Sequence, residues 1–334
     1  MPDINIISPK WTENVQKAAN GFLPSGDSNS IDSQLNAWNQ FKNLLSKSVT
    51  AGSIFKNTIV STYSLVYTAS LAYSGGVLAP NGDIHFIPFS ANRGQKIDIN
   101  GVVSTYSLVY TTSNAYTGGV LASNGDIHFI PFSANRGQKI DSSGVVSTYS
   151  LVYTTSSAYR GGVLAPNGDI HFAPRNANRG QKINNSGVVS TYSLVYTLTS
   201  EAYFGGVLAP NGDIHFIPGS ADRGQKINIS GVVSTYSLIY TTSSAYNSGV
   251  LSPSGDIHFI PFRANRGQKI DNNGVVSTYS LVHTSDPAFH GGILTPNGDV
   301  HFIPYGANRG QKISTTSCLP FDIGTCCSSF LNKF

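Results

Sequence analysis

Residues 75–88 read GGVLAPNGDIHFIP, and close copies of this stretch occur six times in the 334-residue chain. The copies begin at Gly75, Gly118, Gly161, Gly205, Ser248 and Gly291, so the period is 43 residues and once 44. Every copy contains Gly, Pro and β-branched residues, which excludes pairs of helices as the repeating unit. The Asn-Gly pair tolerates positive φ and favours a tight hairpin, so the unit is expected to consist of strands.

One unit contains four strand-like runs separated by turn signals. In the unit that begins at Gly161 they cover residues 161–165, 170–174, 181–184 and 188–197. Large and small side chains alternate along the last run with the period of two that a strand requires. Four antiparallel strands of this length form one blade of a β-propeller. We therefore expect an all-β, six-bladed β-propeller, with a β-solenoid as the alternative.

The order of the partial units predicts how the ring closes. The run STYSLVYT and its variants begin at Ser61, Ser104, Ser147, Ser190, Ser234 and Ser277. The first of them precedes the first GGVLAPNG stretch, and the last unit, ending near Ser314, has none after it. Residues 57–68 are therefore expected to pair near Lys312 as the outer strand of the last blade. This closure by an N-terminal outer strand would leave no exposed edge.

The units resemble known repeats. Over residues 57–314 they are similar to β-propeller blade repeats, and GGVLAPNGDIHFIP resembles blade motifs of bacterial and viral repeat proteins. WD and kelch repeats do not match, because both tryptophans, Trp11 and Trp38, lie outside the units. The resemblance implies architecture alone, since propellers include enzymes, lectins and scaffolds.

The repeats divide the chain into three expected parts: a helical N-terminal extension at 1–50, the propeller at 51–314 and a cysteine-containing tail at 315–334. Apolar residues that return on one face predict a helix over about residues 30–48. This helix would pack on the propeller or dock a partner.

Composition narrows the partners and leaves the compartment open. Charged residues make up 11% of the chain, and its net charge of +4 comes from scattered single residues, which argues against nucleic-acid binding. No signal peptide and no membrane span can be recognised, so the localisation stays unknown. The three cysteines, Cys318, Cys326 and Cys327, all lie in the tail, and whether they form a disulfide is open.

A histidine recurs in the second strand of every unit, two residues after an aspartate. The histidines are His85, His128, His171, His215, His258 and His301. Symmetry-related positions on this strand are too far apart to share a metal ion, whose ligands lie about 2 Å from it. We therefore expect them to be structural, each buried between blades with a hydrogen-bond partner, and we expect no metal and no cofactor.

One arginine also recurs in every unit, in the stretch NRGQK or DRGQK. The positions are Arg93, Arg136, Arg179, Arg223, Arg266 and Arg309. Six arginines on one type of loop would form a positive ring that attracts sulfate, sialic acid or phosphate groups. Alternatively, each arginine bonds loop carbonyls or an aspartate of the neighbouring blade.

The positions that differ between units predict a recognition surface. Just before the glycine pair the six units have Ser74, Thr117, Arg160, Phe204, Asn247 and His290. The connections between the second and third strands also vary, and in an antiparallel blade both places lie at the same end. The candidate binding residues at this end are Arg160, Arg175, Phe204, Arg263, His290 and Tyr305, because Arg and aromatic residues anchor interfaces. Neutral drift of exposed loops is the alternative.

Enzyme motifs cannot be recognised in the chain: there is no phosphate-binding loop, no metalloprotease pair and no nucleophile elbow. Nearly identical blades also offer the same groups six times, whereas an active site needs different groups together. The sequence therefore favours a non-catalytic binding or structural module, not an enzyme, that presents its varied face to a protein or particle surface, for example in a virion. A multivalent carbohydrate-binding lectin that recognises glycan surfaces is the alternative. A hydrolase-type propeller enzyme is the third hypothesis.

Overall fold

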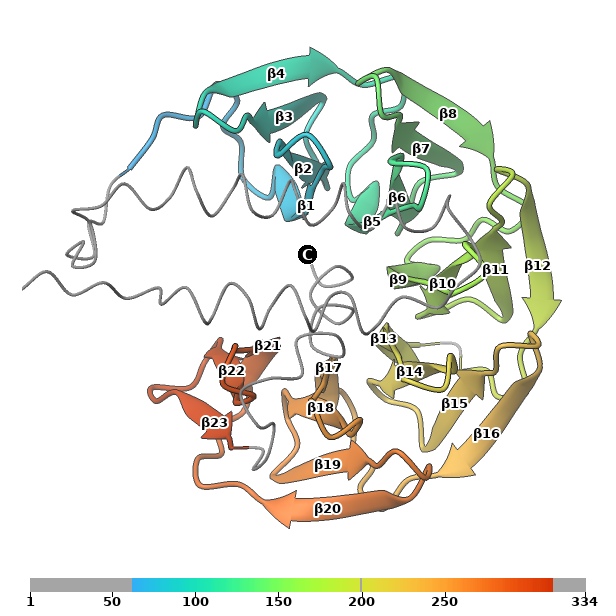
Figure 1. Ribbon diagram of the computed structural model, residues 1–334, viewed down its shortest axis with the longest axis vertical. Helices are drawn as coiled ribbons and strands as arrows, with labels where there is room; N and C mark the ends of the chain where they lie inside the picture. The colour runs from blue at the N-terminus through green and yellow to red at the C-terminus, as the bar shows by residue number, and fades with distance from the viewer. Residues whose placement is uncertain (1–61, 199, 315–334) are drawn as a thin grey trace, which may run out of the picture. The chain divides into compact units, whose positions relative to one another are not determined.

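The computed structural model describes residues 62–198 and 200–314, which contain strands and no helix. The chain divides into two units, residues 1–63 and 64–334, and the second contains all described strands. Five antiparallel sheets have four strands each and the sixth has three. In Figure 1 the first strand of each sheet faces the centre and the last strand lies outermost. This is the arrangement of blades in a propeller.

The strands repeat with nearly constant bounds. The innermost strands are β1 (Tyr73–Leu78), β5 (Tyr116–Leu121), β9 (Tyr159–Leu164), β13 (Tyr203–Leu208), β17 (Tyr246–Leu251) and β21 (Phe289–Leu294). The second strands are β2 (Ile84–Pro88), β6 (Ile127–Pro131), β10 (Ile170–Pro174), β14 (Ile214–Pro218), β18 (Ile257–Pro261) and β22 (Val300–Pro304). The third strands are β3 (Arg93–Ile97), β7 (Arg136–Ile140), β11 (Arg179–Ile183), β15 (Arg223–Ile227), β19 (Arg266–Ile270) and β23 (Gln311–Ile313). The outer strands are β4 (Val103–Ser107), β8 (Val146–Ser150), β12 (Val189–Ser193), β16 (Val233–Ser237) and β20 (Val276–Ser280).

The hydrophobic core lies between consecutive sheets. Ile130 of the second sheet, for example, packs with the fully buried Tyr159 and Phe172 of the third. The inner strands approach so closely that a Cβ atom on Gly162 would lie 2.6 Å from Cδ1 of Ile130. The second glycine of the repeated pair is thus required by packing between blades rather than by a turn.

A buried glutamine links each outer strand to the next sheet. The Oε1 atom of Gln225 in β15 accepts hydrogen bonds from the amides of Val195 and Tyr196, at 3.0 and 2.8 Å. These two residues follow β12, which belongs to the preceding sheet. The outer strand is therefore shorter than the expected run 188–197, because its last residues bond to the neighbouring blade instead.

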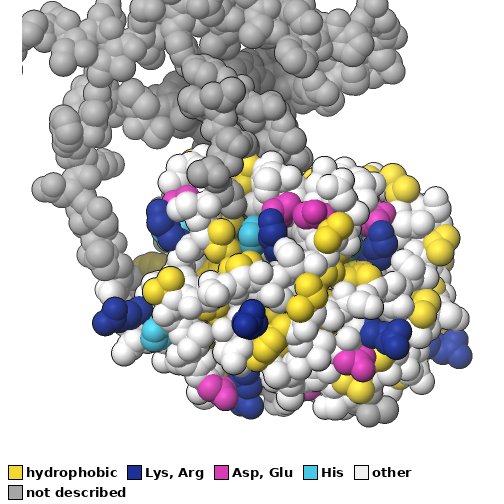
Figure 2. Space-filling model, turned by 90° about the horizontal axis from the view of Figure 1, so that it is seen from below, with side chains coloured by type: hydrophobic (Ala, Val, Ile, Leu, Met, Phe, Trp, Pro, Cys, Tyr) yellow, Lys and Arg dark blue, Asp and Glu magenta, His cyan; other side chains and the backbone are white. Residues whose placement is uncertain are grey.

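The expected propeller is confirmed as an all-β arrangement of six repeated sheets. The predicted N-terminal helix and the C-terminal tail lie outside the described residues, so the three-part division of the chain stays a prediction. Residues 62–68 contain no strand, and residues 57–61 lie outside the described part, so closure by an N-terminal strand also stays a prediction. Across the described segments there is no helix that could cross a membrane. Lys and Arg side chains are spread over the face shown in Figure 2, and several of them lie beside Asp or Glu side chains.

Candidate functional site

The varied loops surround a cavity of about 370 Å³ at one end of the ring. Five of the six predicted binding residues line it: Arg160, Phe204, Arg263, His290 and Tyr305. The sixth, Arg175, lies next to them, with its guanidinium carbon 5.8 Å from the centre of the Phe204 ring. The structure thus brings together all six predicted binding residues, although they belong to four separate sheets.

Arg160 and His290 meet across the centre of the ring. They occupy the same position of units three and six, on β9 and β21, and Nη2 of Arg160 lies 3.4 Å from Nε2 of His290. The Arg160 guanidinium also lies over the Phe204 ring, 4.6 Å from its centre, which favours the cation. A single position of the repeat therefore supplies four different side chains to one cavity, those of Arg160, Phe204, Asn247 and His290.

The contact with Arg160 determines the protonation of His290. An arginine can only donate, so Nε2 of His290 must accept and the imidazole must be neutral. Burial and the Arg160 charge both lower the pKa of His290 below its ordinary value. The ring stacks on Tyr305 with centres 5.5 Å apart, and the side chain of Asn247 donates to the His290 carbonyl oxygen. The cavity thus holds a neutral imidazole whose only lone pair, on Nε2, accepts the contact from Arg160.

Arg160 lacks a carboxylate partner within 4 Å in the part of the chain that the structure describes. Burial and the nearby Arg175 lower the pKa of Arg160 to about 10, so it stays positively charged at neutral pH. A partly buried cation of this kind attracts an anionic oxygen of a ligand.

Glu201 is the functional candidate that the sequence analysis missed. Its carboxylate pairs with Nη2 of Arg175 and accepts a hydrogen bond from Oγ of Ser244 at 3.1 Å, and it lines the cavity. Its backbone has a φ of 56°, a left-handed conformation that is uncommon for a residue other than glycine. Two features of the sequence single out Glu201. The 44-residue unit contains an extra residue just before it, and it is one of only two glutamates in the chain.

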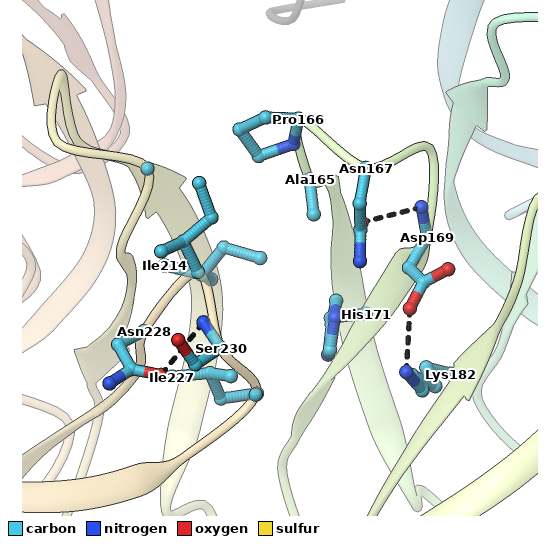
Figure 3. A pocket seen from close by; sticks show the side chains of 13 residues that line it. Ala165, Pro166, Asn167, Asp169, His171, Lys182, Ile214, Ile227, Asn228 and Ser230 are labelled. Atoms are coloured by element: carbon cyan, nitrogen blue, oxygen red, sulfur yellow. Dashed lines mark hydrogen bonds and ion pairs between the residues drawn. The ribbon is translucent and has the colours of Figure 1, made fainter.

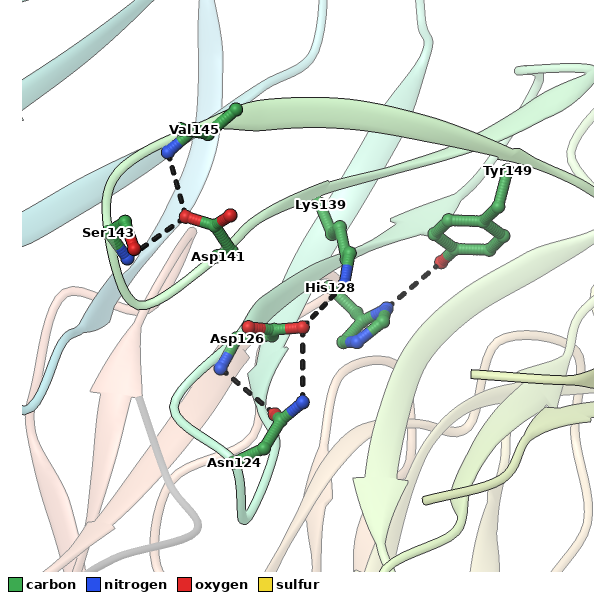
Figure 4. A network of polar contacts seen from close by, with 8 residues as sticks. All are labelled: Asn124, Asp126, His128, Lys139, Asp141, Ser143, Val145 and Tyr149. Atoms are coloured by element: carbon green, nitrogen blue, oxygen red, sulfur yellow. Dashed lines mark hydrogen bonds and ion pairs between the residues drawn. The ribbon is translucent and has the colours of Figure 1, made fainter. Parts of the chain in front are cut away.

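The recurrent histidines lie away from this cavity, and five of the six are buried. In Figure 4, Nδ1 of His128 lies 3.3 Å from the Tyr149 hydroxyl, while the neighbouring Asp126 pairs with Lys139 at 2.6 Å. His85, His171, His215 and His258 have the same tyrosine partner in their own sheets. His301 differs, since it is exposed and has no such partner among the described residues.

A smaller cavity of about 120 Å³ lies beside one of these histidines, between the third and fourth sheets. Figure 3 shows Asp169, His171 and Lys182 on one side of it and Ile214 and Ile227 on the other. Equivalent residues recur in nearly every unit, so the lining of this cavity is not specific to one pair of sheets.

The recurrent arginines lie at the start of the third strands. All six are exposed, and in five units the arginine is the first residue of the third strand. Their side chains form no ion pair within the described ranges, so the aspartate pairing is absent there, and the positive ring that attracts anionic groups stays a prediction. Within the same ranges no group of three or more His, Cys, Asp or Glu side chains is placed to hold a metal ion.

Comparison with known proteins places the chain in a family. The sequence model of the Virginiamycin B lyase family matches residues 43–317. Virginiamycin B lyase from Staphylococcus aureus has a similar structure, with 20% identity and a TM-score of 0.66 over 77% of this chain and 87% of that one. A catalytically inactive histidine-to-alanine variant of it, solved with quinupristin, gives 20% identity and 0.64 over 76% and 86%. A streptogramin B lyase gives 21% and 0.63 over 73% and 80%. The search of curated proteins found no match.

These findings overturn one expectation. We expected a non-catalytic binding or structural module, with a lectin as the alternative. This prediction is wrong, because the family that matches is one of enzymes. Repetition does not exclude an active site, because the residues that are identical in all units do not form the cavity. The residues that differ between units line it instead. The likeness to solved structures shows the fold alone, and the narrower resemblance to GGVLAPNG-type blades stays a prediction. The match over most of its length shows that the chain belongs to the Virginiamycin B lyase family.

Proposed function

We propose that this protein is a lyase whose active site is the axial cavity, with His290 as the general base and Arg160 as the group that stabilises negative charge. The observation that carries the proposal is the contact between Nη2 of Arg160 and Nε2 of His290. This contact places a neutral imidazole beside a guanidinium that has no carboxylate partner among the described residues. Only units three and six supply these two side chains.

This pair of groups suits an elimination reaction. A substrate carbonyl oxygen would first draw the Arg160 guanidinium away from Nε2 of His290, which frees the lone pair. That lone pair then removes a proton from the carbon atom next to the carbonyl group, and Arg160 stabilises the charge that develops on the carbonyl oxygen. The electrons of the broken C–H bond form a double bond, and the leaving group departs with its own bonding pair. The proton stays on His290 until the leaving group or solvent takes it. No water is consumed, which distinguishes this reaction from hydrolysis.

The surroundings of the pair suit a small organic molecule with apolar groups. Phe262 and Tyr305 line the cavity with ring centres 5.7 Å apart, and the Phe204 ring, which lies under the Arg160 guanidinium, lines it as well. A volume of about 370 Å³ lies in the usual range for small-molecule sites. Related enzymes carry the names of virginiamycin B and streptogramin B, and one was solved with quinupristin. We infer that the substrate belongs to this class of antibiotic.

The test is turnover of quinupristin by the purified full-length protein, followed by liquid chromatography and mass spectrometry. We expect products whose combined mass equals that of the substrate, with no added water. His290→Ala should lower kcat/KM by about 100-fold or more, the usual contribution of a general base. Arg160→Ala should lower it by a similar factor, the usual effect of losing one oxyanion donor.

The control is Arg309→Ala, which removes an exposed arginine outside the cavity and should leave turnover unchanged. Thermal melting of each variant separates loss of chemistry from loss of folding. Products that contain added water would contradict the lyase assignment, and failure to convert quinupristin would contradict the substrate. Turnover that survives His290→Ala would contradict the site.

A further inference from the structure

The cavity around Arg160 holds more positive than negative charge. Arg175, which lies beside the cavity, pairs with the carboxylate of Glu201. Arg263, which lines the cavity, pairs with Asp286, whose Oδ1 lies 3.3 Å from Nε of the arginine. Arg160 has no carboxylate partner within 4 Å among the described residues. Three guanidinium groups face two carboxylates, so one positive charge is left unbalanced, and it belongs to Arg160.

The unbalanced charge is partly shielded from water. The Arg160 guanidinium lies 4.6 Å from the centre of the Phe204 ring, and Phe204 is 7% exposed. Burial and the nearby Arg175 lower the pKa of Arg160 to about 10, because its surroundings do not compensate its charge. A cation in such a place gains more from an anionic oxygen than an exposed arginine does, since water screens the attraction less.

His290 supplies a second hydrogen-bond donor once it is protonated. Its Nε2 lies 3.4 Å from Nη2 of Arg160 and accepts in the free protein. An anion that draws the guanidinium away from Nε2 places a negative charge beside the ring, and this raises the pKa of His290. The protonated Nε2 then donates to the anion, and Arg160 donates to it as well. The anion and the proton therefore bind together.

The other groups that face His290 carry no charge at neutral pH. Tyr305 stacks on the ring at 5.5 Å, Phe262 meets it edge-on at 6.4 Å, and Asn247 donates to the His290 carbonyl oxygen. Within the described ranges no carboxylate lies within 4 Å of the imidazole. Burial and the Arg160 charge lower the pKa of His290 in the free protein, and a bound anion compensates the charge that opposes protonation.

The cavity has room for such a ligand and for an organic group attached to it. Its volume is about 370 Å³, and the hydroxyl groups of Ser243 and Ser244 line it together with Asn247. Phe262 and Tyr305 form an aromatic part of the lining, with ring centres 5.7 Å apart. The lining therefore suits an inorganic oxyanion or the carboxylate of a small aromatic molecule.

We propose that this cavity binds a small oxyanion together with one proton, with Arg160 as the cation that holds the anion and His290 as the group that takes up the proton. The inference goes beyond the proposed lyase activity and does not rest on it, because binding requires no turnover. An anion held in this way would inhibit the proposed elimination, since a protonated His290 cannot act as a base.

Isothermal titration calorimetry of the purified full-length protein with sodium sulfate tests the proposal. Sulfate does not titrate between pH 6 and pH 8, and two buffers of different ionisation enthalpy give the number of protons taken up. We expect one sulfate per chain, uptake of up to about one proton, and an affinity that rises by up to about tenfold for each unit by which the pH falls. Absence of binding, or binding without proton uptake at any pH in this range, would overturn the proposal.

Three variants locate the anion. Arg160→Gln should weaken sulfate binding by about tenfold or more, because a charge-assisted hydrogen bond is lost. His290→Gln should bind sulfate more weakly and independently of pH. The matched control is Arg309→Ala, which removes an exposed arginine outside the cavity and should change neither the affinity nor the proton uptake. Unchanged binding in Arg160→Gln would assign the sulfate to other arginines and contradict the proposal. Circular dichroism of each variant establishes that it is folded.

A measurement on the unaltered protein makes the test independent of the folding of the cavity variants. The ring signals of His290 in nuclear magnetic resonance spectra should titrate at a higher pH in sulfate than in chloride of equal ionic strength. The same titration midpoint in both salts would show that the anion does not reach His290, and the proposal would be wrong.

Benzoate in place of sulfate distinguishes the two sources of an oxyanion. Tighter binding of benzoate would indicate the carboxylate of an aromatic molecule, because Phe262 and Tyr305 can contact its ring. Tighter binding of sulfate would indicate an inorganic anion. Both results support the proposal only if Arg160→Gln weakens the binding, and otherwise they contradict it.

Discussion

Five buried histidines should make the propeller unfold in weak acid. Burial lowers the pKa of His128, His171, His215 and His258 from 6.5 to about 4, and it lowers that of His85 as well. The unfolded chain therefore binds more protons than the folded one wherever the pH lies between about 4 and 6.5. Stability is complete above pH 6.5, decreases as the pH falls through this window, and changes little from these groups below it.

The magnitude follows from the four printed shifts and is large compared with the stability of a typical domain. Each of these side chains is 4 or 5% exposed, so solvent screens it little. A fall from 6.5 to about 4 corresponds to roughly 3 kcal/mol for each histidine at pH 4. The four together lower the free energy of unfolding by on the order of 10 kcal/mol, which matches the whole stability of many domains. Lysine–aspartate pairs add little here, because the lowered pKa values of Asp83, Asp126 and Asp299 act below this window.

The assay is the urea midpoint measured by circular dichroism between pH 8 and pH 4. We expect a constant midpoint above pH 7 and a steep fall below pH 6, with a slope of several protons per molecule. His171→Gln should reduce that slope by about one proton, because glutamine does not titrate. A midpoint that stays constant down to pH 4.5 would refute the assignment of these residues as buried and neutral.

Two further predictions follow from single groups. The pH profile of kcat/KM with quinupristin should fall on the acid side at a pH below 6.5, where His290 becomes protonated, and on the alkaline side near pH 10, where Arg160 loses its charge. An acid fall that persists in His290→Gln, or an alkaline fall that persists in Arg160→Ala, would argue against the role of that residue. Gln181→Ala should lower the free energy of unfolding by about 2 to 4 kcal/mol in urea titrations, because it leaves the amides of Val152 and Tyr153 without their acceptor. A loss below about 1 kcal/mol would show that water replaces the side chain as the acceptor.

Periodicity made most of the fold predictable, and local contacts explain the parts that it missed. The six starting glycines, the Asn-Gly hairpins and the alternating run after residue 188 led to six four-stranded blades. The bounds of the outer strands were wrong because Gln225 takes the amides of Val195 and Tyr196 into the next sheet, a long-range bond that no pattern within one unit reveals. The helix expected at 30–48 lies outside the described residues and stays a prediction.

The candidate site was predictable as a set of positions but not as chemistry. The positions that vary between units led to Arg160, Phe204 and His290, and the structure brings all three to one cavity. The chemical roles of Arg160 and His290 could not be predicted from the sequence, because they depend on the contact between units three and six. Glu201 was missed because it lies outside the two varied places, the residue before the glycine pair and the connection between the second and third strands, although its unit is one residue longer than the others.

Repetition itself explains how one catalytic site can arise in a ring of near-identical blades. The residue before each glycine pair lies near the same end of the inner strand in every unit, so equivalent positions of different units can meet near the axis. Arg160, Phe204, Asn247 and His290, which occupy this position in units three to six, line one cavity. A substitution there changes the chemistry of the cavity without disturbing the packing between blades, which depends on other residues. The glutamine contacts between neighbouring sheets and the histidine–tyrosine contacts within five of them recur along the chain, so this position is free to differ, and the contact between Arg160 and His290 is the result.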